Sequence, residues 1–81
     1  MTKTEIRDSI TDLLSKLDTR ERMEMLANLM ISQGFLLMGT PDAVVTPQNV
    51  FETIMRDRDE HGETLGNAFA MQGLLMLQWL E

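Results

Sequence analysis

The sequence predicts an all-α fold, a small bundle of about four helices at residues 3–17, 19–38, 47–61 and 64–80. Three observations predict it. Apolar residues recur at intervals of three and four along these segments, which is the periodicity of a helix face. Thr2, Asp18 and Thr46 stand where the first three helices would need an N-cap, and the composition, 43% hydrophobic and 25% charged, is that of a folded chain. Because 81 residues are too few for two cores, residues 1–81 are expected to form one domain.

The first predicted helix begins after Thr2. Thr2 and Glu5 have the three-residue spacing of a capping box, in which each side chain bonds the backbone of the other. Five apolar residues follow at helical spacing and form one stripe: Ile6, Ile10, Leu13, Leu14 and Leu17. The charged residues occupy the rest of the circumference, so we expect the stripe to be buried and the other face to be solvated.

The second predicted helix begins after Asp18, which has Glu21 at the capping-box spacing. From Met23 onward this segment is apolar on more than one face, and a helix of that kind is central or shared between molecules. Gly34 lowers helix stability by about 1 kcal/mol relative to Ala. Gly34 is therefore expected either to end the helix or to let a neighbouring helix approach closely.

The last two predicted helices have different sequence signals. Thr46-Pro47 starts the third helix, because proline is favoured at the first helical position. Its expected buried stripe consists of Val50, Phe51, Ile54 and Met55. The fourth helix carries no charge, and its small residues line up on one side where another backbone can come close: Gly66, Ala70 and Gly73.

The net negative charge of the chain limits which kinds of molecule it is expected to bind. The net charge is −6, and residues 25–81 hold seven acidic residues against only Arg56 and Arg58. A surface of that sign repels phosphate backbones, so we expect no direct nucleic-acid binding, whereas a basic protein partner fits. The chain has no cysteine, which excludes disulfides and thiolate zinc sites.

A membrane-associated helical hairpin is a less favoured alternative. The uncharged runs at 25–41 and 64–80 are each 17 residues long, at the lower end of the range that spans a bilayer. Polar residues such as Asn28 and Gln72 interrupt them, so no membrane association is expected. The first residues are charged from Lys3 and lack an apolar signal core, and the expected location is the cytoplasm.

The residue inventory argues against an enzyme. His61 is the only histidine, and no serine stands in a Gly-x-Ser-x-Gly spacing. The segment from Asp57 to Glu63 resembles the first half of a calcium loop, but Ala68 replaces the bidentate glutamate that such a loop requires. We therefore expect no catalytic residue, no cofactor and no metal ion.

The same segment carries a candidate interaction site. Acidic residues gather where the third helix ends, although a helix C-terminus favours cations: Asp57, Asp59, Glu60 and Glu63. Carboxylates placed against the helix dipole indicate a partner that supplies positive charge.

The surplus of apolar faces predicts self-association. A small monomer needs one apolar face from each helix, whereas the second and fourth helices offer two or three. The eight methionines add side chains typical of adaptable contact surfaces. We expect a homodimer whose contact comes mainly from these two helices: Phe35, Leu36, Leu37, Met71, Leu75 and Trp79.

The leading hypothesis for function is a small, non-enzymatic protein–protein interaction or regulatory protein, of the adaptor or inhibitor type, that acts as a helical homodimer. It would dock an apolar helical surface, ringed by acidic residues, onto another protein. The alternative is an acidic mimic of nucleic acid that inhibits a basic protein, whose binding would weaken steeply with salt.

Overall fold

The computed structural model describes residues 1–81 and contains four α-helices and no strand. They are α1 (Lys3–Leu14), α2 (Thr19–Leu37), α3 (Pro47–His61) and α4 (Leu65–Leu80). The predicted all-α class and the four helices are confirmed. No helix has the combination of length and apolarity that crossing a bilayer requires.

The helix ends follow local chemistry. The side chains of Thr2, Asp18, Thr46 and Thr64 each accept a hydrogen bond from the backbone N–H three residues on, as N-caps do. The first helix ends three residues earlier than predicted. Successive backbone bonds there join residues three apart, from Lys16 to Leu13 and from Leu17 to Leu14, so the chain tightens out of the α-helix.

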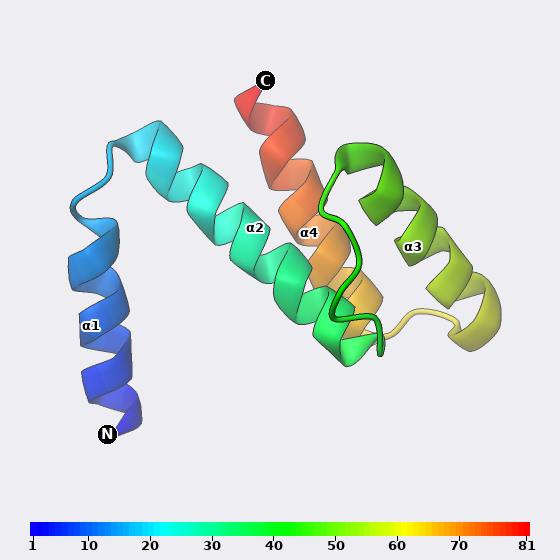
Figure 1. Ribbon diagram of the computed structural model, residues 1–81, viewed down its shortest axis with the longest axis horizontal. Coiled ribbons are helices and arrows are strands. Elements are labelled where there is room, and N and C mark those ends of the chain that lie inside the picture. The colour runs from blue at the N-terminus through cyan, green and yellow to red at the C-terminus, as the bar shows by residue number, and fades with distance from the viewer.

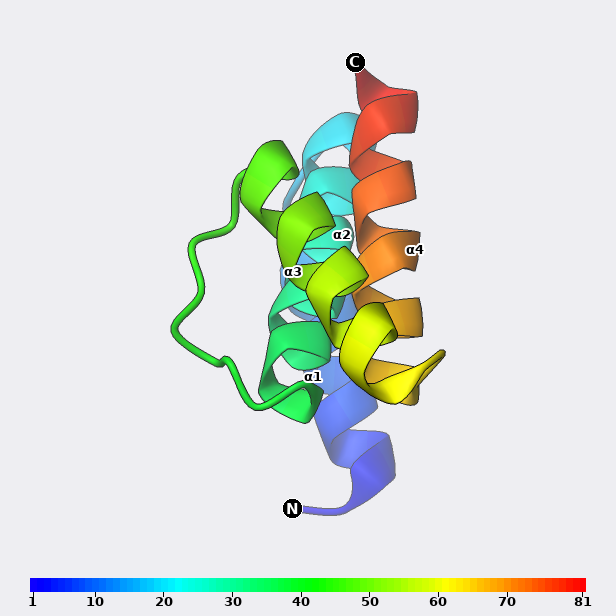
Figure 2. The same cartoon turned by 90° about the vertical axis from the view of Figure 1, so that its right-hand side faces the viewer.

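Two of the helices, α2 and α4, form a central pair, and α1 and α3 lie on either side of it. α2 and α4 lie antiparallel and side by side, and α3 packs on one side of the pair (Figure 1). Figure 2 looks onto α3 and shows α2 behind it and α4 alongside. Residues 38–46 run back along the pair to the start of α3, whereas α1 stands apart at the opposite side (Figure 1).

Glycines set the contact between α2 and α4. A Cβ atom added to Gly34 would lie 2.6 Å from the carbonyl oxygen of Gly66 and 2.7 Å from the amide nitrogen of Ala70. One added to Gly73 would lie 2.6 Å from the carbonyl oxygen of Ala27. The two backbones are therefore in direct contact, and Gly34 admits a neighbouring helix rather than ending its own.

The core lies between α2, α3 and α4. Six side chains form it: Ile31, Phe35, Val50, Ile54, Ala70 and Leu74. α1 contributes no buried residue, so the predicted burial of its stripe is wrong and the packed bundle has three helices rather than four. The stripe predicted for α3 is also shifted, because Thr53 is buried in the place expected for Phe51 and Met55, which are exposed.

The first prediction concerns the close contact between α2 and α4. Gly34→Ala should lower the free energy of unfolding by about 1–2 kcal/mol, because overpacking against backbone costs more than the helix propensity that alanine adds. Urea unfolding followed by circular dichroism measures it. Gln33→Ala changes an exposed neighbour on the same helix and is the control. Equal or higher stability of Gly34→Ala would contradict the backbone contact.

Candidate interaction surfaces

α1 is an amphipathic helix without a cover. Its apolar stripe is present as the sequence predicts, yet Ile6 and Ile10 are about half exposed and Leu13 is 61% exposed. Leu14 and Leu17, at the end nearest α2, are partly buried. An amphipathic helix normally buries such a stripe against another apolar surface, so α1 is a candidate contact element.

Hydrogen bonds at the turn hold α1 in place. The guanidinium of Arg22 on α2 donates to the carbonyl oxygens of Leu14, at 3.2 Å, and Leu17, at 3.3 Å. Asp18 caps α2 in the same turn, accepting from the amide of Glu21 at 2.8 Å. That backbone hydrogen bond lowers the pKa of the Asp18 carboxyl. The direction of α1 is thus fixed by polar contacts at its end rather than by packing along its length.

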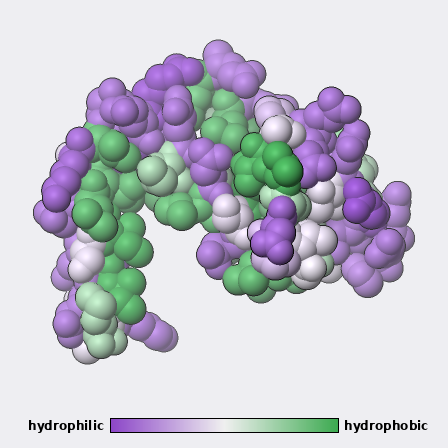
Figure 3. All heavy atoms as spheres, in the orientation of Figure 1, coloured by the Kyte–Doolittle hydropathy of each residue, from purple (hydrophilic) through white to green (hydrophobic).

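A wedge-shaped hollow separates α1 from α2. Its volume is about 460 Å³, and we call it the α1–α2 wedge. Figure 3 shows apolar residues along the inner side of α1, facing the hollow. Seven residues line the wedge: Lys3, Ile6, Arg7, Ile10, Thr11, Leu14 and Leu26.

The side of the α2–α4 pair opposite α3 is also apolar. Successive helix residues turn by about 100°. On α2, Phe35 packs into the core beside α3, and Leu37, two residues further on, therefore points to the opposite side. On α4, Met71 packs against the same core, so Phe69, two residues before it, also points to the opposite side. We call this side the uncovered face, and it contains no charged residue: Met23, Leu26, Met30 and Leu37 on α2, and Leu65, Phe69, Met76 and Leu80 on α4. Leu37, Leu65 and Phe69 are exposed and the other five are partly buried.

The apolar residues predicted for a dimer contact do not form one patch. Phe35 is 1% exposed and belongs to the core, and Met71 packs against that core. Leu36 and Leu37 are exposed near the end of α2. Because the helices are antiparallel, Leu75 and Trp79 lie at the other end of the molecule, where they form a shallow hollow with Gln78.

One residue of the predicted acidic site has a structural role. Asp57 Oδ2 accepts hydrogen bonds from Thr64 Oγ1 and Asn67 Nδ2, both at 2.9 Å. Asn67 is 2% exposed, and its Nδ2 also donates to the carbonyl oxygen of Gly62 at 2.8 Å. Asp57 therefore ties α3 to the start of α4, which explains one acid near this helix end without any partner.

The other three acids remain exposed. Asp59, Glu60 and Glu63 lie where α3 ends and α4 begins. The Glu60 Oε2 is 3.6 Å from the His61 Nε2, and neither Asp59 nor Glu63 has a cationic partner within 4 Å. Trp79 stands at the far end of α4, about 24 Å from Glu63 along the helix axis. The sequence predicts an apolar surface ringed by acidic residues, but these acids and Trp79 belong to two separate surfaces.

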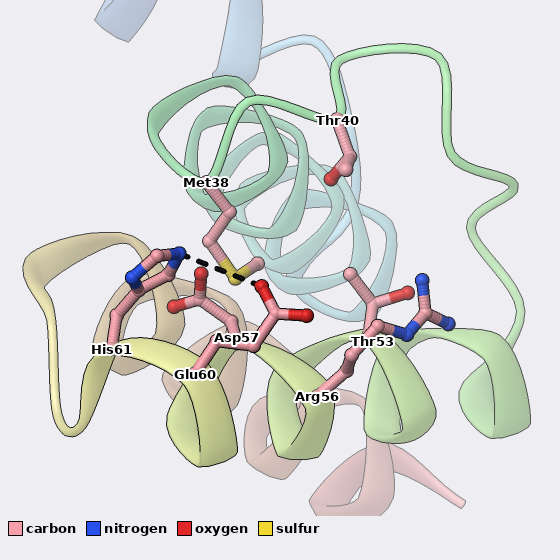
Figure 4. Close-up of a pocket in the computed structure, with 7 residues that line it drawn as sticks. All are labelled: Met38, Thr40, Thr53, Arg56, Asp57, Glu60 and His61. Atoms are coloured by element: carbon pink, nitrogen blue, oxygen red, sulfur yellow. Dashed lines mark ion pairs between the residues drawn. The ribbon is translucent and has the colours of Figure 1, made fainter.

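The hollow beside the acidic end is small. Figure 4 shows the residues that line it, among them Thr53, Arg56 and His61, and its volume is about 70 Å³. Pockets that enclose small molecules usually measure about 300–1,000 Å³. Nowhere in the chain do three His, Asp or Glu side chains come together so that they could hold a metal ion.

Protein-family models, curated proteins and solved structures give no match to this chain. The fold and its surfaces define only a class, a small all-α protein with a three-helix core and a projecting helix.

Sequence reasoning did not select Ile6, Ile10 and Leu13 as contact residues, although their stripe was visible. Periodicity shows that a helix face is apolar, but not whether its own chain or another molecule covers it. The balance of charges around α1 gave no further signal.

The α3–α4 junction makes a second prediction. Asn67→Ala should lower the free energy of unfolding by about 1–2 kcal/mol, because Asp57 loses one of its two hydrogen-bond donors and the Gly62 carbonyl loses the donor from Asn67. Thermal unfolding in parallel with Asp59→Asn, an exposed change in the same region, measures it. If the two variants lose the same small amount, the hydrogen-bond network does not stabilise the junction.

The turn before α2 makes a third prediction. The lowered pKa of Asp18 means that its cap is complete above the ordinary aspartate value of about 3.9 and is lost as pH falls through the lower folded-state value. Asp18→Asn keeps a capping oxygen without titrating. The difference in unfolding free energy between wild type and Asp18→Asn should therefore be constant above pH 5 and move against the wild type at lower pH. A difference independent of pH would contradict the cap.

Proposed function

We propose that this protein is a non-enzymatic interaction protein that works as a helical homodimer. The observation that carries the proposal is α1, a helix with a complete apolar stripe and no buried residue. An exposed apolar stripe favours association, because removing apolar surface from water contributes about 25 cal/mol of favourable free energy for each Å².

The exposed area supports a dimer quantitatively. The chain exposes 5814 Å², whereas a compact monomer of this mass exposes about 5,000 Å². The excess of about 800 Å² equals what one partner contributes to a standard protein–protein interface. The radius of gyration agrees, at 13.7 Å against about 12 Å for a compact chain of this length.

The acidic end supports a second contact with a target protein. Asp59, Glu60 and Glu63 lie away from α1, so they stay accessible when α1 is covered. A basic protein surface is the complementary partner, and the dimer would regulate that partner by occupying it.

Mimicry of nucleic acid is the second candidate, and the same three carboxylates favour it. The two hypotheses differ in their response to salt. Binding through carboxylates alone weakens steeply as salt is raised, whereas a contact that also buries apolar surface weakens little.

Light scattering coupled to gel filtration tests the dimer. At micromolar concentration the protein should elute as one species of twice the 9.3 kDa chain mass. The mass should hold between low and high salt, because apolar burial is not screened. A single species of one chain mass across this range would contradict the proposed function.

A further inference from the structure

We propose that α1 is an exchanged arm: the α1 of each copy enters the α1–α2 wedge of a second copy and packs its stripe on the partner's uncovered face. This inference rests on the homodimer proposed above and identifies the surfaces that form it. Each copy gives one helix and receives one, so the two contacts are identical.

The chain does not cover α1 by itself. The turn at residues 15–18 is short, and Arg22 bonds both Leu14 and Leu17, the last carbonyls before it. Held in this direction, α1 diverges from the pair and leaves the wedge open. Only Leu26 of α2 lines the wedge with α1, so an additional apolar element has to enter it to complete the packing.

A second α1 has the dimensions and chemistry of that element. Twelve residues make a helix about 18 Å long. Its stripe of Ile6, Ile10 and Leu13 matches an uncovered face that contains no charged residue over both α2 and α4. Lys3 and Arg7 flank the stripe at the edge of the wedge, where their ends stay in water while the stripe is buried.

The symmetry of the arrangement favours a second copy over another protein. A two-fold axis places each arm in the other copy's wedge, so donor and acceptor surfaces are covered in one step. The excess exposed area of about 800 Å² for each chain is the size that such an exchange needs. A foreign helix would cover Ile6 and Ile10 on the wedge side of one α1 only, so it would not give this reciprocal contact.

Cysteine cross-linking tests the exchange directly. The chain has no cysteine, so Ile10→Cys with Met30→Cys supplies the only two thiols. A short bis-maleimide is added to a mixture of ¹⁵N-labelled and unlabelled protein, and mass spectrometry separates links between chains from links within one chain. The expected product links position 10 of one chain to position 30 of another. Asp12→Cys with Met30→Cys, on the opposite side of α1, should give little product.

Two outcomes overturn the exchange without touching the dimer. A link confined to one chain shows that α1 closes on its own body. No link, with a scattering mass of two chains, shows a dimer built on other surfaces. A scattering mass of one chain for the wild type instead contradicts the proposed function, and the exchange with it.

A charge on the stripe gives an independent readout. Ile10→Asp should weaken the dimer at least about a hundredfold, because the interface would bury an unpaired carboxylate. Thr4→Asp adds the same charge to an exposed position of α1 that is not part of the stripe and should leave the dimer unchanged. Since α1 supplies no core residue, circular dichroism should show the three-helix core intact in both variants. Equal dimer affinity for the two variants would overturn the exchange.

Discussion

The structure depends on backbone contact between α2 and α4. Gly34 and Gly73 leave no room for a Cβ atom, and each faces backbone atoms of the other helix. Because the helix axes lie so close, the large side chains cannot sit between the two helices and are directed to the two flanks of the contact. α3 covers one flank and completes the core there, while the other flank becomes the uncovered face. The same glycines thus determine the core and the surface available to a partner.

The core produced in this way is small. Twelve of 81 residues are buried, so the hydrophobic contribution available to a single chain is limited. α1 adds nothing to it, although its stripe has the residues to do so. Any partner that binds only the folded chain stabilises it by mass action, and a second copy does this at a concentration set by the protein itself. Association and folding stability are therefore expected to be linked in this protein.

Local features of the fold could be predicted from the sequence and tertiary ones could not. The caps at Thr2 and Asp18 and the close approach along Gly66 and Gly73 depend on neighbouring residues or on the size of single side chains. The place of α1 depends on how the other helices pack, which periodicity does not contain. Asp57 shows the same limit for the acidic site, because its partner Asn67 is ten residues away on another helix. A local rule, the helix dipole, singles out the other three acids, whose role in binding stays a prediction.

The charge distribution relates the proposed dimer contact to the proposed contact with a basic partner. Residues 1–24 carry six acids and five bases, so the region that contains α1 is nearly neutral, whereas the remainder carries a net charge of −5. In an exchanged dimer the nearly neutral arms come together, and the repulsion between the two acidic bodies is reduced because each faces an arm with Lys3 and Arg7. The acidic ends of α3 are then displayed twice, once by each copy. Two identical acidic ends on one particle bind a basic target that has two matching sites more tightly than either end alone, since the second contact forms within the complex. Under this proposal, dimerisation through the nearly neutral arms is the step that would give a small acidic protein a usable affinity for a basic partner.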